Sequence, residues 1–274
     1  MNWLESLIYG LISGVSEFLP ISSSGHQQIL LSLFGINERD PVRDLFTHLA
    51  MLLAIVISNK SLIDLVKRER SVSRKNRNSV RQNMRALLDW RLVRNSVLPL
   101  LITMFLLRFI ISPSNSLLIT VIFFAINGFI LYLPNRMMQG NKDARSMTGL
   151  DSTLLGCSGA ISIFPGISRL GCTYSVAVIR GADRKHAVSW SLILSIYALA
   201  IICVLDLFSI FSTGAPGFWG NLFTYILSGI TAYLGSNLSI SAIRFLVVRP
   251  SNNGFAYYSW GASLFTFILY LTIC

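Results

Sequence analysis

The chain has 274 residues, of which 53% are hydrophobic and only 13% are charged, and its mean hydropathy is +0.61. A soluble domain usually carries about 25% charged residues, so this sequence lacks the polar surface that a water-soluble globule needs. The composition excludes an ordinary cytosolic enzyme, a disordered chain and a secreted mini-protein. It predicts a single polytopic membrane domain, 1–274, because a spanning helix needs about 20 apolar residues and the length allows about six to eight such segments.

Apolar segments that we expect to span the membrane lie at 44–58, 97–112, 116–134, 187–211, 219–243 and 254–274. Two further apolar stretches, 3–35 and 150–180, are interrupted by proline, glycine and serine. Because proline removes a backbone donor and stops a helix, we expect each of these two stretches to contain a break.

One polar segment, 59–95, holds most of the positive charge. Eleven basic and three acidic side chains lie between Lys60 and Arg94, which accounts for +8 of the net charge of +11. Such an excess is typical of a cytoplasmic loop and attracts anionic lipid headgroups. No base-reading module accompanies the charge, so nucleic acid is not an expected partner.

Three other basic clusters are expected on the cytoplasmic side as well: 136–145, 180–185 and Arg249. All of them lie on that side only if the second broken stretch enters and leaves the membrane on the same side. By the same count the first broken stretch enters from the opposite side. The sequence therefore predicts an all-α polytopic membrane protein with an inverted-topology repeat, each half a re-entrant helical hairpin plus three transmembrane helices. The expected boundaries are about 1–135 for the first repeat and about 148–274 for the second.

The two breaks have similar sequences. The first reads FLPISSSGH at 18–26 and the second reads FPGISRLGCT at 164–173. Unpaired backbone groups in hydrocarbon cost several kcal/mol each, so a broken helix must be buried in protein or line a wet cavity. Free N–H groups at the following helix start form an anion site, and serine hydroxyls add donors. We expect a polar pocket near mid-membrane that suits phosphate-like groups.

Three ionisable residues, Glu17, His26 and Arg169, lie inside these breaks. Intramembrane charges are rare and are functional hypotheses by default. Arginine suits bidentate phosphate contact, histidine can transfer a proton or attack, and glutamate can hold a divalent cation. Together they have the parts for phosphoryl transfer. The alternatives are that Arg169 only pairs with Glu17 and that His26 is a satisfied buried histidine.

Other polar residues give weaker signals. His48 lies in the expected span LFTHLAMLL, and a structural and a cavity-facing role are equally compatible with its position. We expect Glu5 and Asp206 near the headgroups. The serines of the first break can also bond to helix carbonyls, as serine often does in membranes.

The sequence resembles the undecaprenyl-diphosphate phosphatases of bacteria, the bacitracin-resistance type. The similarity is carried by GVSEFLPISSSGH at 14–26 and PGISRLGCT at 165–173, with weaker similarity in LFTHLAMLLAIVI and in AIRFL and FAYY near the C-terminus. The resemblance implies a multi-pass hydrolase of the bacterial cell membrane. It would convert a polyprenyl diphosphate to the monophosphate and so recycle the lipid carrier of cell-wall synthesis.

The resemblance also implies roles for individual residues and a divalent cation, Mg²⁺ or Ca²⁺. Glu17 would be the catalytic or metal-binding carboxylate, and Ser23 and His26 would lie at the reacting phosphate. Arg169 would stabilise the transferring phosphoryl group. The remaining residues expected to bind phosphate are Ser22, Ser24, Gly166, Ser168 and Thr173.

Two positions depart from the family pattern. Ser13 stands where the family usually has an acidic or amide residue, four positions before Glu17 and on the same helix face. Leu170 stands where the family usually has serine. These departures leave open a divergent member with another lipid phosphate as substrate, or one that has lost hydrolysis.

Two other kinds of function stay open at this stage. Inverted repeats with mid-membrane breaks are also the plan of many transporters, so a flippase of a lipid-linked phosphate is the alternative. A structural scaffold is a third reading, but it does not explain buried charges at Glu17 and Arg169. The sequence does not fix the oligomeric state, and a homodimer is one of the states it allows.

Overall fold

The computed structural model describes residues 1–75, 90–110, 116–137, 140–144, 146–246 and 253–273. Its helices are α1 (Trp3–Glu17), α2 (Ser23–Leu33), α3 (Pro41–Ser58), α4 (Lys60–Lys75), α5 (Trp90–Ile110), α6 (Leu117–Tyr132), η1 (Leu133–Arg136), α7 (Gly149–Ala160), η2 (Ile161–Ile163), α8 (Arg169–Ile179), α9 (Arg184–Thr213), α10 (Phe218–Leu246) and α11 (Gly254–Ile273). The described residues form no β-strand, which confirms the predicted all-α class.

Both predicted breaks are present as helix–turn–helix hairpins. The first runs from α1 through the turn 18–22 into α2, and the second runs from α7 through η2 and the turn 164–168 into α8. The serine before each second helix, Ser22 or Ser168, caps it by accepting a hydrogen bond from the backbone N–H three residues on. Proline ends the first helix and serine starts the second, as the sequence pattern predicts.

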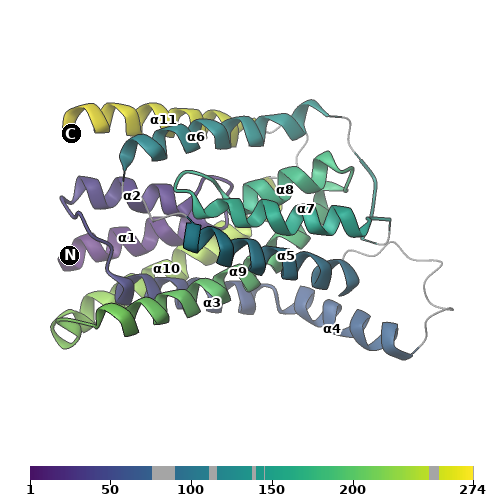
Figure 1. The fold of residues 1–274 in the computed structure, drawn as a ribbon, viewed down its shortest axis with the longest axis horizontal. Coiled ribbons are helices and arrows are strands. Elements are labelled where there is room, and N and C mark those ends of the chain that lie inside the picture. The colour runs from purple at the N-terminus through teal and green to yellow at the C-terminus, as the bar shows by residue number, and fades with distance from the viewer. Residues whose placement is uncertain (76–89, 111–115, 138–139, 145, 247–252, 274) are drawn as a thin grey trace.

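The hairpins enter the helical bundle from opposite ends, and their turns meet near its middle (Figure 1). Helix α1 lies along α10, and α7 lies along α5. Helices α6 and α11 pack against each other on one side, and α3 packs between α9 and α10. If α1 corresponds to α7 and α5 to α10, these pairings agree with a two-fold relation between the halves. The inverted repeat and its boundaries stay a prediction.

Glycines allow the closest helix crossings. A Cβ placed on Gly10 or Gly14 of α1 would lie 2.1 Å from a backbone carbonyl of α10, and one on Gly156 of α7 would lie 2.2 Å from the Ser96 carbonyl of α5. Small residues spaced by four are typical of helix pairs that associate in lipid, where close van der Waals contact replaces the hydrophobic effect. The two hairpins are therefore fixed by backbone-to-backbone packing.

Among the described residues, five helices are long and apolar enough to cross a membrane: α3, α5, α6, α9 and α10. Helix α11 has 20 residues and packs on α6, but it is not among them. Its first half is rich in serine and tyrosine, which lowers its hydropathy below that of the other five. The protein is thus a multi-pass membrane protein, with one fewer clear span than the six predicted.

The described part of the basic segment 59–95 is helical, whereas we expected a polar loop. Helix α4 follows α3 directly, and Leu62, Ile63 and Val66 on it pack against the main hydrophobic core. Apolar residues spaced by three and four give a helix one buried face, which accounts for the difference. The residues at 76–89 lie outside the described part of the chain.

Replacing Gly14 with leucine tests the α1–α10 crossing. The new side chain has no space against the Ala232 carbonyl. We therefore expect the free energy of unfolding to fall by about 1–3 kcal/mol, the usual cost of overpacking. Thermal unfolding in detergent measures it. The matched control is Gly261→Leu on α11, because a Cβ there meets nothing within 4 Å. Equal stability of the two variants would contradict the crossing.

Candidate active site

The two hairpin turns are joined through Ser22. Its backbone has a φ of +70°, a left-handed conformation that is uncommon outside glycine. In this position its hydroxyl accepts hydrogen bonds from the N–H groups of Gly25 (3.2 Å) and of Gly166 in the other hairpin (3.1 Å). Gly166 has a φ of +107°, and a Cβ there would lie 2.8 Å from the Thr120 carbonyl of α6. The second turn therefore needs glycine where it meets α6.

Asn127 of α6 ties both hairpins to the bundle. Its amide nitrogen donates to the Pro20 carbonyl (3.2 Å), and its amide oxygen accepts the Ser168 N–H (2.9 Å). The side chain is fully buried. Backbone groups freed by the two breaks thus find partners in the protein, as a lipid environment requires.

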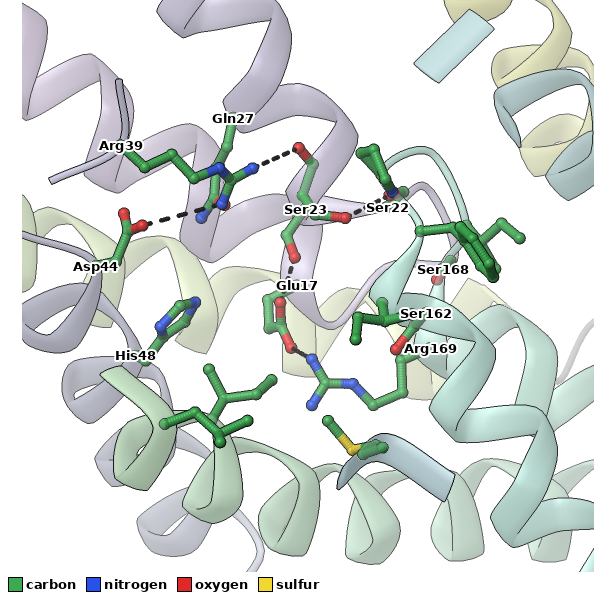
Figure 2. A pocket seen from close by; sticks show the side chains of 18 of the residues that line it. Glu17, Ser22, Ser23, Gln27, Arg39, Asp44, His48, Ser162, Ser168 and Arg169 are labelled. Atoms are coloured by element: carbon green, nitrogen blue, oxygen red, sulfur yellow. Dashed lines mark hydrogen bonds and ion pairs between the residues drawn. The ribbon is translucent and has the colours of Figure 1, made fainter. Parts of the chain in front are cut away.

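A cavity of about 720 Å³ lies beside the joined turns. One wall is polar and carries residues from the first hairpin, the 34–40 connection, α3 and α9. The opposite wall is mainly apolar and comes from α5, α6, the second turn and α9. The polar lining residues are Glu17, Ser22, Ser23, Ser24, Gln27, Arg39, Asp44, His48, Ser162, Ser168, Arg169, Asp206 and Ser209. Figure 2 shows ten of these thirteen converging from both hairpins and α3.

Glu17 and Arg169 form an ion pair across the two hairpins, with 2.6 Å between Arg169 Nη2 and Glu17 Oε1. Their side chains are 4% and 9% exposed, so both are desolvated. The other carboxylate oxygen, Oε2, accepts a hydrogen bond from the Ser23 hydroxyl (Figure 2). The pairing left open by the sequence is present, and it lies on the cavity.

The ion pair leaves part of Arg169 unused. Its Nε and Nη1 groups are buried and have no hydrogen-bond partner. A buried donor without a partner costs about 1–3 kcal/mol, and more when it is charged. An oxyanion in the cavity would satisfy both groups, and arginine presents such donors in a planar fork that matches phosphate. Arg169 therefore keeps two donors beyond the one that pairs with Glu17.

Arg39 is the second cation on the cavity. Its guanidinium donates to the side-chain oxygen of Gln27 (3.3 Å) and to the Ser24 carbonyl (3.4 Å), and it lies 3.9 Å from the Asp44 carboxylate. The side chain is 29% exposed. It lies beside α2 and α3, on the far side of Ser23 from Arg169 (Figure 2).

Some predicted site residues line this cavity and others do not. Glu17, Arg169 and the serines at 22, 23, 24 and 168 do. Thr173 does not: its hydroxyl donates to the carbonyls of Arg169 and Leu170 within α8. Gly166 acts through its backbone N–H on Ser22 and is not a lining residue. The phosphate contacts of Thr173 and Gly166 stay a prediction.

His26 is also absent from the cavity lining. Its ring contacts the Ser22 carbonyl through Nδ1 (2.7 Å) and the Tyr258 hydroxyl of α11 through Nε2 (2.7 Å), and it stacks on the Tyr258 ring. His26 follows Ser23 by three residues on α2, and its side chain faces α11 and α6. Both nitrogens are engaged, as in the structural alternative, and the predicted catalytic role of His26 stays a prediction.

Ser13 does not contact Glu17 as a second ligand would. It is fully buried and accepts a hydrogen bond from the side-chain nitrogen of Gln27 (3.2 Å). Gln27 in turn lines the cavity and bonds to Arg39. The hydroxyl at this position therefore orients an amide on the cavity wall.

Sequence reasoning missed six of the polar lining residues: Gln27, Arg39, Asp44, Ser162, Asp206 and Ser209. Asp206 was expected near the headgroups, but its carboxylate lies 2.6 Å from His48 Nδ1 and faces the cavity. The available signal was spacing, because Asp44 precedes His48 by four residues and shares its helix face. Asp206 gave no such signal within the long apolar run of α9.

A metal ion would have few protein ligands here. Among the described residues no group of three or more histidine, cysteine, aspartate or glutamate side chains is arranged to hold one. Mg²⁺ is usually bound through one or two carboxylates together with waters and substrate phosphates, whereas Ca²⁺ takes six to eight oxygen ligands. Glu17 with a bound phosphate fits the first pattern, so the donor set suits Mg²⁺ shared with an anionic substrate.

The bundle and its cavity define a multi-pass membrane protein with an internal cavity that has a polar wall. The sequence model of the bacitracin resistance protein BacA matches residues 6–265, and the chain belongs to this family. It is 30% identical over 261 residues to undecaprenyl-diphosphatase of Carboxydothermus hydrogenoformans, covering 95% of this chain and 94% of that protein.

Similar relatives occur in other organisms. The chain is 30% identical over 273 residues to undecaprenyl-diphosphatase 3 of Bacillus cereus strain ATCC 10987, with 99% of each chain covered. It is 30% identical over 264 residues to undecaprenyl-diphosphatase of Methanococcus maripaludis strain C7, covering 96% of this chain and 98% of that protein. The resemblance inferred from the two motifs thus extends over nearly the whole chain.

Replacing Asn127 with alanine tests the link between the hairpins. The change leaves the Ser168 N–H and the Pro20 carbonyl without the side chain that bonds to them. We therefore expect the free energy of unfolding to fall by about 1–3 kcal/mol because of the unsatisfied groups. Thermal unfolding in detergent measures it. Asn221→Ala is the control, because that side chain is exposed and bonds to Gly217 and Tyr225, both four residues away in the chain. A destabilisation no larger than the control's would argue against the link.

Proposed function

We propose that this protein hydrolyses undecaprenyl diphosphate, or a closely similar polyprenyl diphosphate, to the monophosphate and phosphate. The observation that carries the proposal is Arg169, which lines the cavity beside Ser23 and Glu17 and keeps two buried donors without a partner. Membership of the BacA family supports it, as do relatives that bear the name undecaprenyl-diphosphatase. Recycling of the cell-wall lipid carrier and resistance to bacitracin follow from this activity.

The polar wall supplies groups for phosphoryl transfer. Arg169 neutralises charge on the transferring phosphoryl group, which is the largest demand of such reactions. The Ser23 hydroxyl donates to Glu17, and a hydroxyl beside a carboxylate has the arrangement of a nucleophile with its base. Of the two attacking groups considered, Ser23 is favoured over His26, because Ser23 lines the cavity and His26 does not.

The apolar wall fits the other part of a polyprenyl diphosphate. The apolar lining includes Ile119, Ile122 and Phe123 of α6 together with Ile202 and Leu205 of α9. Ile122 is 52% exposed in the structure, so this wall continues to the outer, lipid-facing surface. A prenyl chain can follow it from the bilayer while its diphosphate reaches Arg169.

Glu17 would hold the Mg²⁺ of this site together with the substrate phosphates. The ion would add positive charge at the phosphoryl oxygens. The cavity otherwise has three carboxylates, of Glu17, Asp44 and Asp206, against the guanidinium groups of Arg39 and Arg169. A diphosphate entering such a site needs further positive charge, which supports a metal.

The topology proposed from the sequence determines which side of the membrane the site faces. With 59–95 on the cytoplasmic side of a bacterial cell membrane, the first hairpin enters from the outer face and the 34–40 connection with Arg39 lies at that face. The basic residues Lys60, Lys67 and Arg68 of α4 would then contact anionic lipid headgroups. The halves would be related as inverted repeats.

The alternative of a flippase without hydrolysis is not favoured. Relatives aligned over nearly the full chain bear the name of a diphosphatase. The Ser23–Glu17 contact beside Arg169 also supplies reactive groups that transport alone does not need.

Phosphate release from undecaprenyl diphosphate in detergent tests the proposal. We expect Arg169→Ala to lower kcat by about 100- to 1000-fold, the usual effect of removing a group that stabilises transition-state charge. Arg169→Lys should recover little of it, because lysine lacks the planar fork. The control is Arg136→Ala, an exposed arginine at the end of η1 that bonds to Tyr132, the last residue of α6. Undiminished release by Arg169→Ala, or lipid translocation by wild type without release, would refute hydrolysis at this site.

Removal of divalent cations tests the role of Glu17. We expect a chelator to abolish phosphate release and Mg²⁺ to restore it more effectively than Ca²⁺, given the small number of protein ligands. Glu17→Gln should raise the Mg²⁺ concentration needed for half-maximal activity. Full activity in the chelator, or an unchanged Mg²⁺ requirement in the variant, would contradict this assignment.

A further inference from the structure

A histidine–aspartate pair lies on the cavity wall and has no part in the function proposed so far. His48 of α3 and Asp206 of α9 both line the cavity, and 2.6 Å separates His48 Nδ1 from Asp206 Oδ2. Their side chains are 13% and 18% exposed. The carboxylate fixes which ring nitrogen carries a proton, and it leaves His48 Nε2 for another partner.

Charge balance in the cavity favours the protonated form of this histidine when substrate is bound. With neutral His48 the lining residues carry three carboxylates and two guanidinium groups, which leaves one negative charge in excess. Asp206 of α9 contacts His48 Nδ1, and Asp44 of the same helix and Glu17 of α1 line the same cavity. Arg39 and Arg169 lie on the same cavity. A diphosphate adds further negative charge, which a proton on His48 offsets.

We propose that His48 is a phosphate-binding residue of the active site. In its imidazolium form, held by Asp206, it donates from Nε2 to an anionic oxygen of the lipid diphosphate. Arg169 then binds the phosphoryl group beside Ser23, and His48 binds oxygens on the α3 side of the cavity. Asp206 is the positioning residue, since it acts through the imidazole. The proposal rests on the proposed function, because it names a second contact for that substrate.

The His48–Asp206 pair also links α3 to α9. If this link had only a structural role, the kinetics would differ from those expected for a substrate-binding histidine. A tie between helices affects stability and total activity, without making substrate affinity depend on the protonation of one side chain. A binding imidazolium makes affinity fall as the pH rises through its titration. The pH dependence of KM therefore separates the two roles.

The experiment measures KM and kcat for farnesyl diphosphate between pH 6 and 9 in the full-length protein with Mg²⁺. We expect the wild-type KM to rise by up to about tenfold per pH unit above the midpoint, as the loss of one bound proton requires. His48→Gln keeps a donor but cannot titrate, so its KM should be nearly independent of pH. It should also exceed the wild-type value at pH 6 by about 10-fold, for the loss of a charge-assisted contact.

Asp206→Asn keeps the shape of the partner and removes its charge. An opposite charge nearby favours the protonated imidazole, so we expect the midpoint of the KM profile to move to lower pH. The control is His186→Gln, the third histidine of the chain, which stacks near Trp190 and does not line the cavity. This variant should keep the wild-type profile. Titration of the substrate's own phosphates is common to every variant and cancels in the comparison.

A wild-type pH profile in His48→Gln would overturn the proposal, as would an unchanged KM at pH 6. If the wild type releases no phosphate from any lipid diphosphate, the proposed hydrolysis fails, and binding of a methylene-bridged farnesyl diphosphonate is measured instead. If affinity for the diphosphonate decreases as the pH rises in wild type and stays constant in His48→Gln, the result supports His48 as a phosphate ligand without catalysis. Equal pH dependence in both proteins overturns it.

Discussion

The ion pair between Glu17 and Arg169 is the interaction on which the site depends. Glu17 is the last residue of α1 and Arg169 is the first residue of α8. Each charge lies at the helix end that the macrodipole disfavours, at a cost of about 0.3–1 kcal/mol apiece, and each is desolvated. Their mutual contact, together with the Ser23 hydroxyl bonded to Glu17, offsets these costs and joins the two broken segments. The resulting arrangement keeps reactive charge inside a membrane protein.

The sequence was most informative where its chemistry conflicted with its surroundings. Glu17 and Arg169 could be predicted because charges inside apolar runs are rare, and the breaks could be predicted because proline and clustered serines interrupt those runs. His26 could not be placed, because the face that a residue presents depends on where its helix starts and how it is rotated. Asp206 could not be placed for a related reason: its depth along the 30-residue helix α9 is set by packing.

The departure at Ser13 illustrates how one substitution changes a neighbouring contact. A carboxylate or amide was expected to approach the metal from this position. In the structure the Ser13 hydroxyl holds the Gln27 amide, which bonds to Arg39. An internal hydrogen bond of this kind is invisible in a sequence, because Ser13 and Gln27 lie on different arms of the first hairpin. The site thus uses an amide and a guanidinium where a second acid was expected.

The glycine-lined contact between α1 and α10 has a consequence for biosynthesis. Helix α1 ends at Glu17 and α10 begins at Phe218, so roughly 200 residues separate the two partners. At a synthesis rate of 5–20 residues per second, the amino-terminal hairpin leaves the ribosome about 10 to 40 seconds before its partner exists. During that interval its polar turn and open glycine face must be sheltered by the insertion machinery or by a chaperone. Assembly of the catalytic chamber is therefore a late, post-insertion event.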